Sequence, residues 1–321
     1  MDNQTIHVIS TPHTISTEKY LSCAFTQKTI DFIKMMNLFD YNIVHYGIET
    51  SNVDCESVDV ISYNTFKEYY PDLNLNDDNI LGNLGNPYRV LNQEYYSLWA
   101  NNTIKRLLKT IRYGDIICYF SPYGSRLVCE GMKHYIGRDC AHVEAGIGYP
   151  SKSFSDFRCF TTYTHMSWML SKEQTHPKFS DWVIPYWVDE SDFDYSSNDK
   201  EDYFVFFGRM LEIKGINIAM QVSEKCNREI LMYGLIPENF SFKNTKNLKY
   251  MGVVSNLGER KNILSKAKAM FMPTMYLEPF GLSGVESLLS GTPVISTDWA
   301  SFSEWNLHGY TGYRCRTFSE F

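Results

Sequence analysis

The sequence lacks several features that would assign it to a specialised class. None of its eight cysteines is spaced C-x-x-C from another, so a zinc site or dithiol motif is not expected. Every apolar run is far shorter than the roughly 18 residues of a transmembrane helix. The first residues lack the basic and long apolar regions of a signal peptide. We therefore expect a cytoplasmic protein with reduced thiols, and expect Cys118 and Cys226, which lie in apolar runs, to be buried.

Neither basic nor acidic residues are concentrated in one part of the chain. The chain has 30 Lys and Arg against 37 Asp and Glu, a formal net charge of −7. A dedicated nucleic-acid-binding protein needs a concentrated basic face, so this class is disfavoured. With 44% hydrophobic residues the chain can bury a sizeable core, and its 321 residues, about twice a typical domain, predict two domains.

Short apolar runs alternate with longer amphipathic segments in both halves of the chain. The expected strands are Ile6–Ile9, Tyr41–Tyr46, Val58–Ser62, Asp115–Phe120, Cys140–Glu144, Tyr203–Gly208, Glu229–Gly234, Leu248–Gly252, Ala269–Pro273 and Pro293–Thr297. The expected helices are Ala24–Phe39, Tyr88–Ile111, Ser125–Ile136, Phe157–Leu170, Gly215–Cys226, Gly258–Ala267 and Ser283–Ser290. This alternation is typical of α/β proteins with doubly wound parallel sheets. The stretch from Pro71 to Pro87 is rich in Asn, Asp and Gly and predicts a long surface excursion.

The two series of elements are separated near Pro185, which is followed by acidic, serine-rich sequence. We predict two Rossmann-like domains, residues 1–186 and 187–321, that face each other across a cleft. Ligands of such sheets bind at the carboxyl ends of the strands. No G-x-G-x-x-G follows the first expected strand, so a dehydrogenase is disfavoured.

One segment places two carboxylates beside an expected helix start. Glu278 follows an expected strand, a turn with Gly281 and Gly284 comes next, and Glu286 lies eight residues after Glu278. Free N–H groups at a helix start bind anions and hydroxyls, and carboxylates accept hydrogen bonds from sugar hydroxyls. The alternative is that Glu278 is a solvated loop charge and that Glu286 only favours the first turns through the helix dipole.

A second segment places two cations at the end of another expected strand. Arg209 follows Gly208, and Lys214 precedes Gly215 at the next helix start. An Arg fork and a Lys point charge at this edge of a parallel sheet can hold a diphosphate. Taken alone, either residue is better explained as a strand-end Arg or a solvated Lys.

Together these segments resemble the retaining GT-B glycosyltransferases of family 4. The matching features are G-R-x4-K-G, E-x7-E with its inner Pro-Phe-Gly, and the trailing Gly-Thr-Pro-Val-Ile-Ser-Thr-Asp. Val183–Asp189 also resembles the interdomain linker of that family, so the motifs cover residues 183–313. The compact length and the composition further resemble virus-encoded members, such as those of chloroviruses.

The resemblance implies an enzyme that transfers a hexose from a nucleoside-diphosphate sugar, of the GDP-mannose or UDP-glucose type, to a hydroxyl acceptor. Residues 187–321 would form the donor domain and residues 1–186 the acceptor-side domain. Arg209 and Lys214 would stabilise the leaving diphosphate, and Glu278 would hold the sugar hydroxyls. The residues assigned to binding the donor nucleotide sugar are Gly208, Val253, Val254, Phe280, Gly281, Leu282 and Glu286.

The N-terminal half departs from the family pattern. The first strand is followed by Ser-Thr-Pro-His13 instead of a glycine-rich loop, and Glu144 stands where family members often have a histidine. The acceptor-side candidates are His13, Tyr123, Glu144 and Gly146. The alternative for Glu144 is a hydrogen-bonded strand-end carboxylate in a glycine turn. Residues 142–146 also look like a stretch of nucleotide-sugar 2-epimerases.

No cofactor and no divalent metal are expected. Asp192-Phe-Asp194 has the D-x-D form of a manganese site, but it lies in Asp- and Ser-rich sequence after the linker and is better interpreted as a solvated charge run. The expected partners are the donor and a glycan, glycoprotein or lipid-linked acceptor, and a homodimer is left open. If the protein is viral, its expected location is the host cytoplasm.

The leading hypothesis is therefore a retaining glycosyltransferase with a front-face mechanism. A nucleotide-sugar 2-epimerase of the same bilobal fold would convert free nucleotide sugar without an acceptor. A non-catalytic nucleotide-sugar-binding protein would bind the donor without turnover. The residues do not identify the base, the sugar, the acceptor or the linkage.

Overall fold

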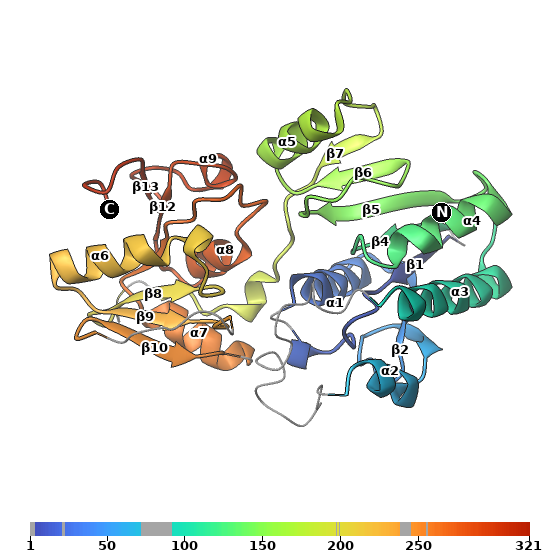
Figure 1. The fold of residues 1–321 in the computed structure, drawn as a ribbon, viewed down its shortest axis with the longest axis horizontal. Coiled ribbons are helices and arrows are strands. Elements are labelled where there is room, and N and C mark those ends of the chain that lie inside the picture. Colours follow the sequence, from blue (N-terminus) through green and yellow to red (C-terminus); the bar gives the residue numbers. More distant parts are fainter. Residues whose placement is uncertain are drawn as a thin grey trace. The chain divides into compact units, whose positions relative to one another are not determined.

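The computed structural model describes residues 4–20, 23–71, 92–196, 198, 200–237, 245–254 and 256–321. The chain divides into two compact units (Figure 1). The first consists of Met1–Thr161 and Met166–Trp187, and the second of Thr162–His165 and Val188–Phe321. Each unit is built around one sheet, and within the described ranges neighbouring strands of each sheet pair in parallel.

The first unit contains a seven-stranded sheet in the order β3-β2-β1-β4-β5-β6-β7. Its strands are β1 Thr5–Ile9, β2 Asn42–Ile48, β3 Glu56–Ile61, β4 Ile116–Tyr119, β5 Ala141–Ile147, β6 Phe157–Phe160 and β7 Asp181–Val183. Its helices are η1 Glu18–Tyr20, α1 Ala24–Asn37, α2 Tyr63–Tyr69, α3 Gln93–Thr110, α4 Ser125–Ile136 and most of α5 Tyr163–Glu173.

The second unit contains a six-stranded sheet in the order β10-β9-β8-β11-β12-β13. Its strands are β8 Phe204–Phe207, β9 Ile230–Tyr233, β10 Leu248–Gly252, β11 Ala269–Met272, β12 Val294–Thr297 and β13 Gly312–Cys315. Its helices are η3 Glu190–Asp192, η4 Glu212–Lys214, α6 Ile216–Cys226, α7 Leu257–Lys266, α8 Leu282–Leu289 and α9 Phe302–Trp305.

Successive residues on the strands of the second sheet point alternately into two apolar cores, one on each face of the sheet. Phe206 and Met232 pack with Ile216 and other residues of α6 on one face. Val205 and Met270 pack on the other face with a cluster that includes residues of α7. Successive strand side chains point to opposite faces, so a strand covered by helices on both sides is apolar at every position. The expected doubly wound α/β fold class is thereby confirmed.

The strand order reverses at one point in each sheet, and this point positions the candidate sites. β1 and β4 are neighbours in the first sheet, and their connections run in opposite directions. β8 and β11 have the same relation in the second sheet. Ligands of such sheets bind at the carboxyl ends of the strands beside this reversal.

The expected helix over Phe157–Leu170 is wrong in its first part. Phe157–Phe160 forms β6, and α5 starts only at Tyr163. The guanidinium of Arg158 donates to both carboxylate oxygens of Asp181 on β7, at 2.6 and 2.5 Å. This long-range pair, which accompanies the parallel pairing of β6 with β7, decides in favour of a strand.

Further elements of the described ranges were not expected from the sequence, namely α2, β7, α9, β13 and the short 3-10 helices η1, η3 and η4. The expected excursion between Pro71 and Pro87 lies, apart from Pro71, outside the described residues. No helix in the described ranges is long and apolar enough to cross a membrane.

All eight cysteines are free thiols. Cys118 is buried as expected, but the expectation for Cys226 is wrong because this residue is exposed. Cys226 is the last residue of α6, which ends at Asn227 in the left-handed conformation, φ 49°. The apolar run therefore ends together with the helix.

We predict that the buried histidine of β2 makes the protein sensitive to acid. His45 is fully buried between the hydroxyls of Ser16 and Ser57, and burial lowers its pKa to about 4. The unfolded chain therefore binds more protons than the folded chain between about pH 6.5 and about pH 4, and stability falls as the pH falls through this window. The lowered pKa of His45 should reduce the free energy of unfolding by about 3 kcal/mol over this window.

The measurement is guanidinium unfolding at about pH 7 and about pH 4 for the wild type and for His45→Gln. The stability lost on acidification should be smaller in the variant by about 3 kcal/mol. His176→Gln, at an exposed position, is the control and should lose as much as the wild type. An equal loss in His45→Gln would contradict the prediction.

Candidate functional site

A glycine at the start of α6 brings the loop after β8 against the loop after β11. Gly215 has φ +81°, and a Cβ at this position would lie 1.9 Å from the carbonyl oxygen of Pro273. Only glycine permits both this conformation and this approach. Lys214, the preceding residue, is therefore held beside the segment that carries Glu278.

Lys214, Tyr276 and Glu278 form a hydrogen-bonded triangle. The Nζ atom of Lys214 lies 2.6 Å from Oε2 of Glu278 and 2.9 Å from the hydroxyl of Tyr276, which donates to the same Oε2 at 2.7 Å. The side chains of Lys214 and Glu278 are 19% and 10% exposed. The structure thus brings together two residues that the sequence analysis assigned to one site, and adds Tyr276, for which the sequence carried no signal.

The turn before α8 is fixed by one hydrogen bond from a tryptophan and one from a serine. The carbonyl of Phe280 accepts hydrogen bonds from Nε1 of Trp305 at 2.7 Å and from the hydroxyl of Ser301 at 3.0 Å. Gly281 occupies the N-cap of α8 with φ +84° and carries no side chain that could cap the helix. The N–H of Gly284 donates to the carbonyl of Gly281, and the N–H groups of Leu282 and Ser283 are suited to an external acceptor.

Glu286 lies within α8 and pairs with a residue that sequence reasoning missed. Its side chain is 1% exposed, and its Oε1 atom lies 3.1 Å from an Nη atom of Arg260 on α7. The guanidinium also lies over the ring of Phe207, 5.5 Å from its centroid, and that ring stacks on Tyr233. Arg260 precedes the buried Ile263 by three residues, and this helical spacing was a usable signal that Arg260 points toward the sheet.

The remaining donor-side candidates follow β8 and β10. Arg209 is exposed, and its guanidinium makes no hydrogen bond or ion pair to any residue within the described ranges. The N–H of Gly208 donates to Tyr233. Val253 and Val254 are partly buried directly after β10, and Val254 packs against the core that contains α7. Within the described part of the chain, no side-chain hydrogen bond or ion pair joins these residues to the triangle of Lys214, Tyr276 and Glu278.

In the first unit, two of the four acceptor-side candidates lie together at the strand-order reversal. His13 follows β1 and Tyr123 follows β4, and their rings meet edge to face with centroids 6.2 Å apart. Phe25 of α1 contacts both rings in the same geometry, at 6.2 and 6.1 Å. The site is therefore an aromatic cluster with one imidazole at the carboxyl edge of the sheet.

Glu144 is fully buried and fully engaged inside the first unit. It accepts hydrogen bonds from the hydroxyl of Tyr149, from the N–H groups of Phe154 and Ser155, and from the Ser155 hydroxyl. Burial raises the pKa of Glu144, although these hydrogen bonds act in the opposite direction. This is the bonding pattern of a structural carboxylate. Gly146 has φ +62°, and its carbonyl accepts a hydrogen bond from Lys28 at 2.6 Å.

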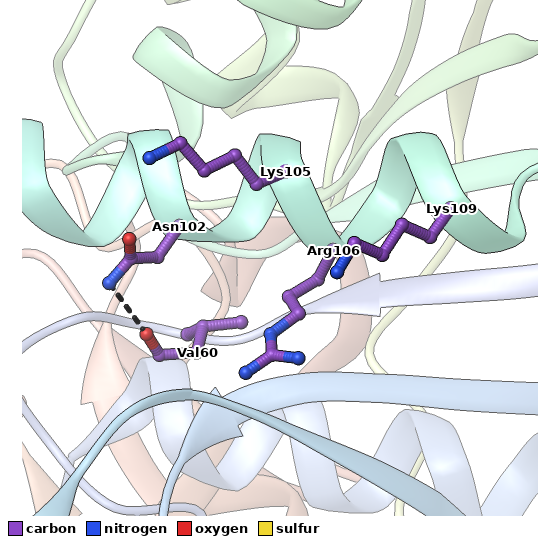
Figure 2. A pocket seen from close by; sticks show the side chains of 5 residues that line it. All are labelled: Val60, Asn102, Lys105, Arg106 and Lys109. Carbon is purple, nitrogen blue, oxygen red and sulfur yellow. Dashed lines mark hydrogen bonds between the residues drawn. The ribbon is translucent and has the colours of Figure 1, made fainter.

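A cavity of about 270 Å³ lies elsewhere in the first unit, between α3 and the end of β3. It is lined by Val60, Asn102, Lys105, Arg106 and Lys109, and none of the candidate residues borders it (Figure 2). The amide of Asn102 donates to the carbonyl of Val60 at 3.0 Å, and the three cations project from one helix.

No group of three or more His, Cys, Asp or Glu side chains with the arrangement of a metal site occurs in the ranges that the structure describes. Asp192 of the D-x-D sequence ends η3 and lies 4.0 Å from the ammonium of Lys261.

The two parallel sheets with their flanking helices define the fold of the GT-B glycosyltransferases. Sucrose-phosphate synthase from Thermosynechococcus elongatus superposes with a TM-score of 0.65 at 13% identity, over 99% of this chain and 88% of that chain. Anabaena HepE in complex with UDP and glucose gives 0.63 at 13%, over 99% and 88%. A glycosyltransferase from Rickettsia africae gives 0.63 at 14%, over 100% and 86%.

Residues 188–319, within the second unit, match the family model of glycosyl transferases group 1. A comparison of the sequence with curated proteins gave no match. The fold and the family match together support glycosyl transfer activity, and they place the matched domain on the residues that carry the Lys214–Glu278 and Arg260–Glu286 pairs.

We predict that Arg260→Met destabilises the second unit by about 3 kcal/mol, because it removes the guanidinium that faces the buried carboxylate of Glu286. Combining it with Glu286→Gln should recover part of the loss, since the buried charge is then absent. Denaturant unfolding measures both effects.

The matched control is Lys261→Met at the next position, where the ion pair with Asp192 is partly exposed and 4.0 Å long. Its cost should stay below about 1 kcal/mol. Equal costs at positions 260 and 261, or no recovery in the double variant, would contradict a stabilising Arg260–Glu286 pair.

Proposed function

We propose that this protein is a retaining glycosyltransferase that moves a hexose from a nucleoside-diphosphate sugar to a glycan or another hydroxyl acceptor. The observation that carries the proposal is the Lys214–Tyr276–Glu278 triangle at the carboxyl edge of the second sheet, beside the N-terminus of α8. The family match over the same residues and the GT-B fold support it. Anabaena HepE, with its bound UDP and glucose, makes a nucleotide sugar a reasonable donor class.

The diphosphate of the donor would bind between Lys214 and Arg209. Lys214 is already held in place by Glu278, so a phosphate oxygen can replace one of its hydrogen bonds without first ordering the side chain. Arg209 is exposed at the end of β8 and can present its planar fork to a second oxygen. Both cations stabilise the negative charge that grows on the leaving phosphate.

Glu278 would accept hydrogen bonds from the hydroxyls of the transferred sugar. The first-turn N–H groups of α8 would donate hydrogen bonds to the same sugar. Glu286 would receive the ribose hydroxyls, and Arg260 would orient that buried carboxylate. The base would lie near Val253 and Val254. GDP-mannose and UDP-glucose are the first donors to test.

We further propose a front-face displacement, in which the leaving phosphate takes the proton of the acceptor hydroxyl. No side chain then has to act as the general base. A hydrolase would instead place two carboxylates about 5–9.5 Å apart on either side of the bond. The pairing of Glu278 with Lys214 and of Glu286 with Arg260 suits ligand binding and charge stabilisation.

The epimerase hypothesis rests on residues 142–146, and their geometry does not favour it. Glu144 is engaged as described above, and the ring of His142 is buried at 3.0 Å from the hydroxyl of Tyr119. The acceptor-side residues that we retain are His13 and Tyr123. A glycan, glycoprotein or lipid-linked acceptor and a cytoplasmic location remain part of the proposal.

We predict that donor binding depends on the charged groups of the second unit. Arg209→Ala, Lys214→Ala and Glu286→Ala should each weaken the binding of UDP-glucose or GDP-mannose by about tenfold or more, since hydrogen bonds to charged groups contribute about 1.5–3 kcal/mol. Isothermal titration calorimetry measures the change.

The control is Arg228→Ala, because Arg228 precedes β9 at the opposite edge of the same sheet and pairs with Asp202 on the surface. Its donor affinity should equal that of the wild type. Unchanged affinity in both Arg209→Ala and Glu286→Ala would reject the assigned donor site.

We predict that Glu278→Gln lowers turnover by roughly a hundredfold while changing the affinity for UDP or GDP much less, because Glu278 is assigned to the sugar and the amide oxygen of Gln can still accept a hydrogen bond from Lys214. Sugar transfer to an acceptor panel is measured by chromatography with EDTA present, since we propose that no divalent metal is required.

Equal losses of nucleotide affinity and turnover would contradict the role of Glu278. Turnover that appears only after addition of Mn²⁺ would contradict the metal-independent mechanism. Product formed without any acceptor would favour the epimerase, and donor binding without turnover on every acceptor would favour a binding protein.

A further inference from the structure

Three side chains with nucleophilic or proton-transfer chemistry lie together at the carboxyl edge of the first sheet. The Sγ atom of Cys23 lies 3.6 Å from Nε2 of His13, and Nδ1 of His13 lies 2.5 Å from the hydroxyl of Thr11. A nucleophile within reach of a base that is itself oriented by a third group is the arrangement that activates thiols. Nothing in the proposed glycosyl transfer uses this thiol.

The surroundings of Cys23 favour its ionised form. Cys23 is partly exposed and occupies the N-cap of α1, where the helix dipole favours negative charge. Burial raises the pKa of the thiol, but the hydrogen bond and charge of His13, together with the hydroxyl and amide of Thr26, bring it down to about 6. His13 is held between the ring edges of Phe25 and Tyr123. The titratable groups that these contacts bring to the site are His13 and Tyr123.

A second cysteine–histidine pair in the same unit shows what this geometry requires. Cys129 lies 3.8 Å from Nδ1 of His142, but both side chains are buried in the core. Burial raises the pKa of Cys129 to about 12 and lowers that of His142 to about 4. Proximity to a histidine alone therefore does not lower the pKa of a thiol in this protein; at Cys23 the lowering comes from the hydrogen bond and charge of His13 together with Thr26.

We propose that Thr11, His13 and Cys23 form a reactive thiol site that exchanges with low-molecular-weight disulfides. The thiolate of Cys23 attacks one sulfur of the disulfide, a new S–S bond forms, and the original S–S bond breaks. The departing half leaves as a thiolate and takes the proton that His13 no longer shares with Cys23. The products are a mixed disulfide on Cys23, a free small thiol and a neutral His13, so atoms, charge and electrons balance.

The experiment treats the reduced full-length chain with glutathione disulfide and follows each cysteine by peptide mass spectrometry. At about pH 6 half of Cys23 is ionised, against about 0.3% of an ordinary thiol of pKa about 8.5, a ratio of about 160. The more acidic thiolate is also the weaker nucleophile, which reduces this rate advantage by about 13-fold. Cys23 should therefore react about tenfold faster than Cys226, which is exposed at the end of α6.

This comparison is made within one molecule and needs no variant. Equal rates for the two cysteines at about pH 6, or modification of Cys226 without modification of Cys23, would overturn the proposal. Because the readout is a mass shift on Cys23, the result does not depend on whether the protein transfers sugars.

Variants then test whether His13 is the activating group. His13→Gln should reduce the rate at Cys23 to that of Cys226, and the pH at which its rate is half-maximal should rise into the ordinary thiol range. His134→Gln, at an exposed position on α4, is the matched control and should leave the rate unchanged. A wild-type rate and pH profile in a folded His13→Gln variant would reject the assignment.

Discussion

The close approach of Gly215 to the carbonyl of Pro273 is the contact on which the second unit's site depends. It joins the loop after β8 to the loop after β11 at the point where the strand order reverses. Lys214 then meets Glu278 at 2.6 Å, and Tyr276 completes the arrangement. Any residue with a side chain at position 215 would separate the two loops, so the spacing of the cations from the carboxylate is a property of this one backbone contact.

A second pair, Arg260 with Glu286, holds a more deeply buried carboxylate of the same unit. A buried carboxylate without a counter-charge is costly, and the guanidinium from α7 supplies that charge while packing on Phe207. Both carboxylates of E-x7-E are thus held by cations that come from other elements of the same unit. The first unit places aromatic rings, an imidazole and a thiol at the corresponding edge of its own sheet.

Much of the fold follows from local pattern. β10 and α4 have the bounds expected from their apolar periodicity, and most other expected elements differ by one to three residues at an end. The failures have physical causes. The local pattern predicts β6 as part of a helix, because its identity as a strand comes from pairing with β7 and from the ion pair of Arg158 with Asp181, which are distant in sequence. β7 and β13 are edge strands of three and four residues, too short for a periodic signal.

The sequence by itself determined the α/β class, most of the helices and strands, and the residue types of the donor-side motifs, because these depend on short-range periodicity and spacing. Only the tertiary structure decided which residues meet. It joined Lys214 to Glu278, recruited Tyr276 and Arg260, buried Glu144 among its own hydrogen-bond donors, and set Cys23 beside His13. The tertiary structure also leaves Cys226 exposed, although its apolar surroundings in the sequence predict burial. Side-chain contacts between separate loops depend on sheet order and backbone approach, and no local pattern encodes them.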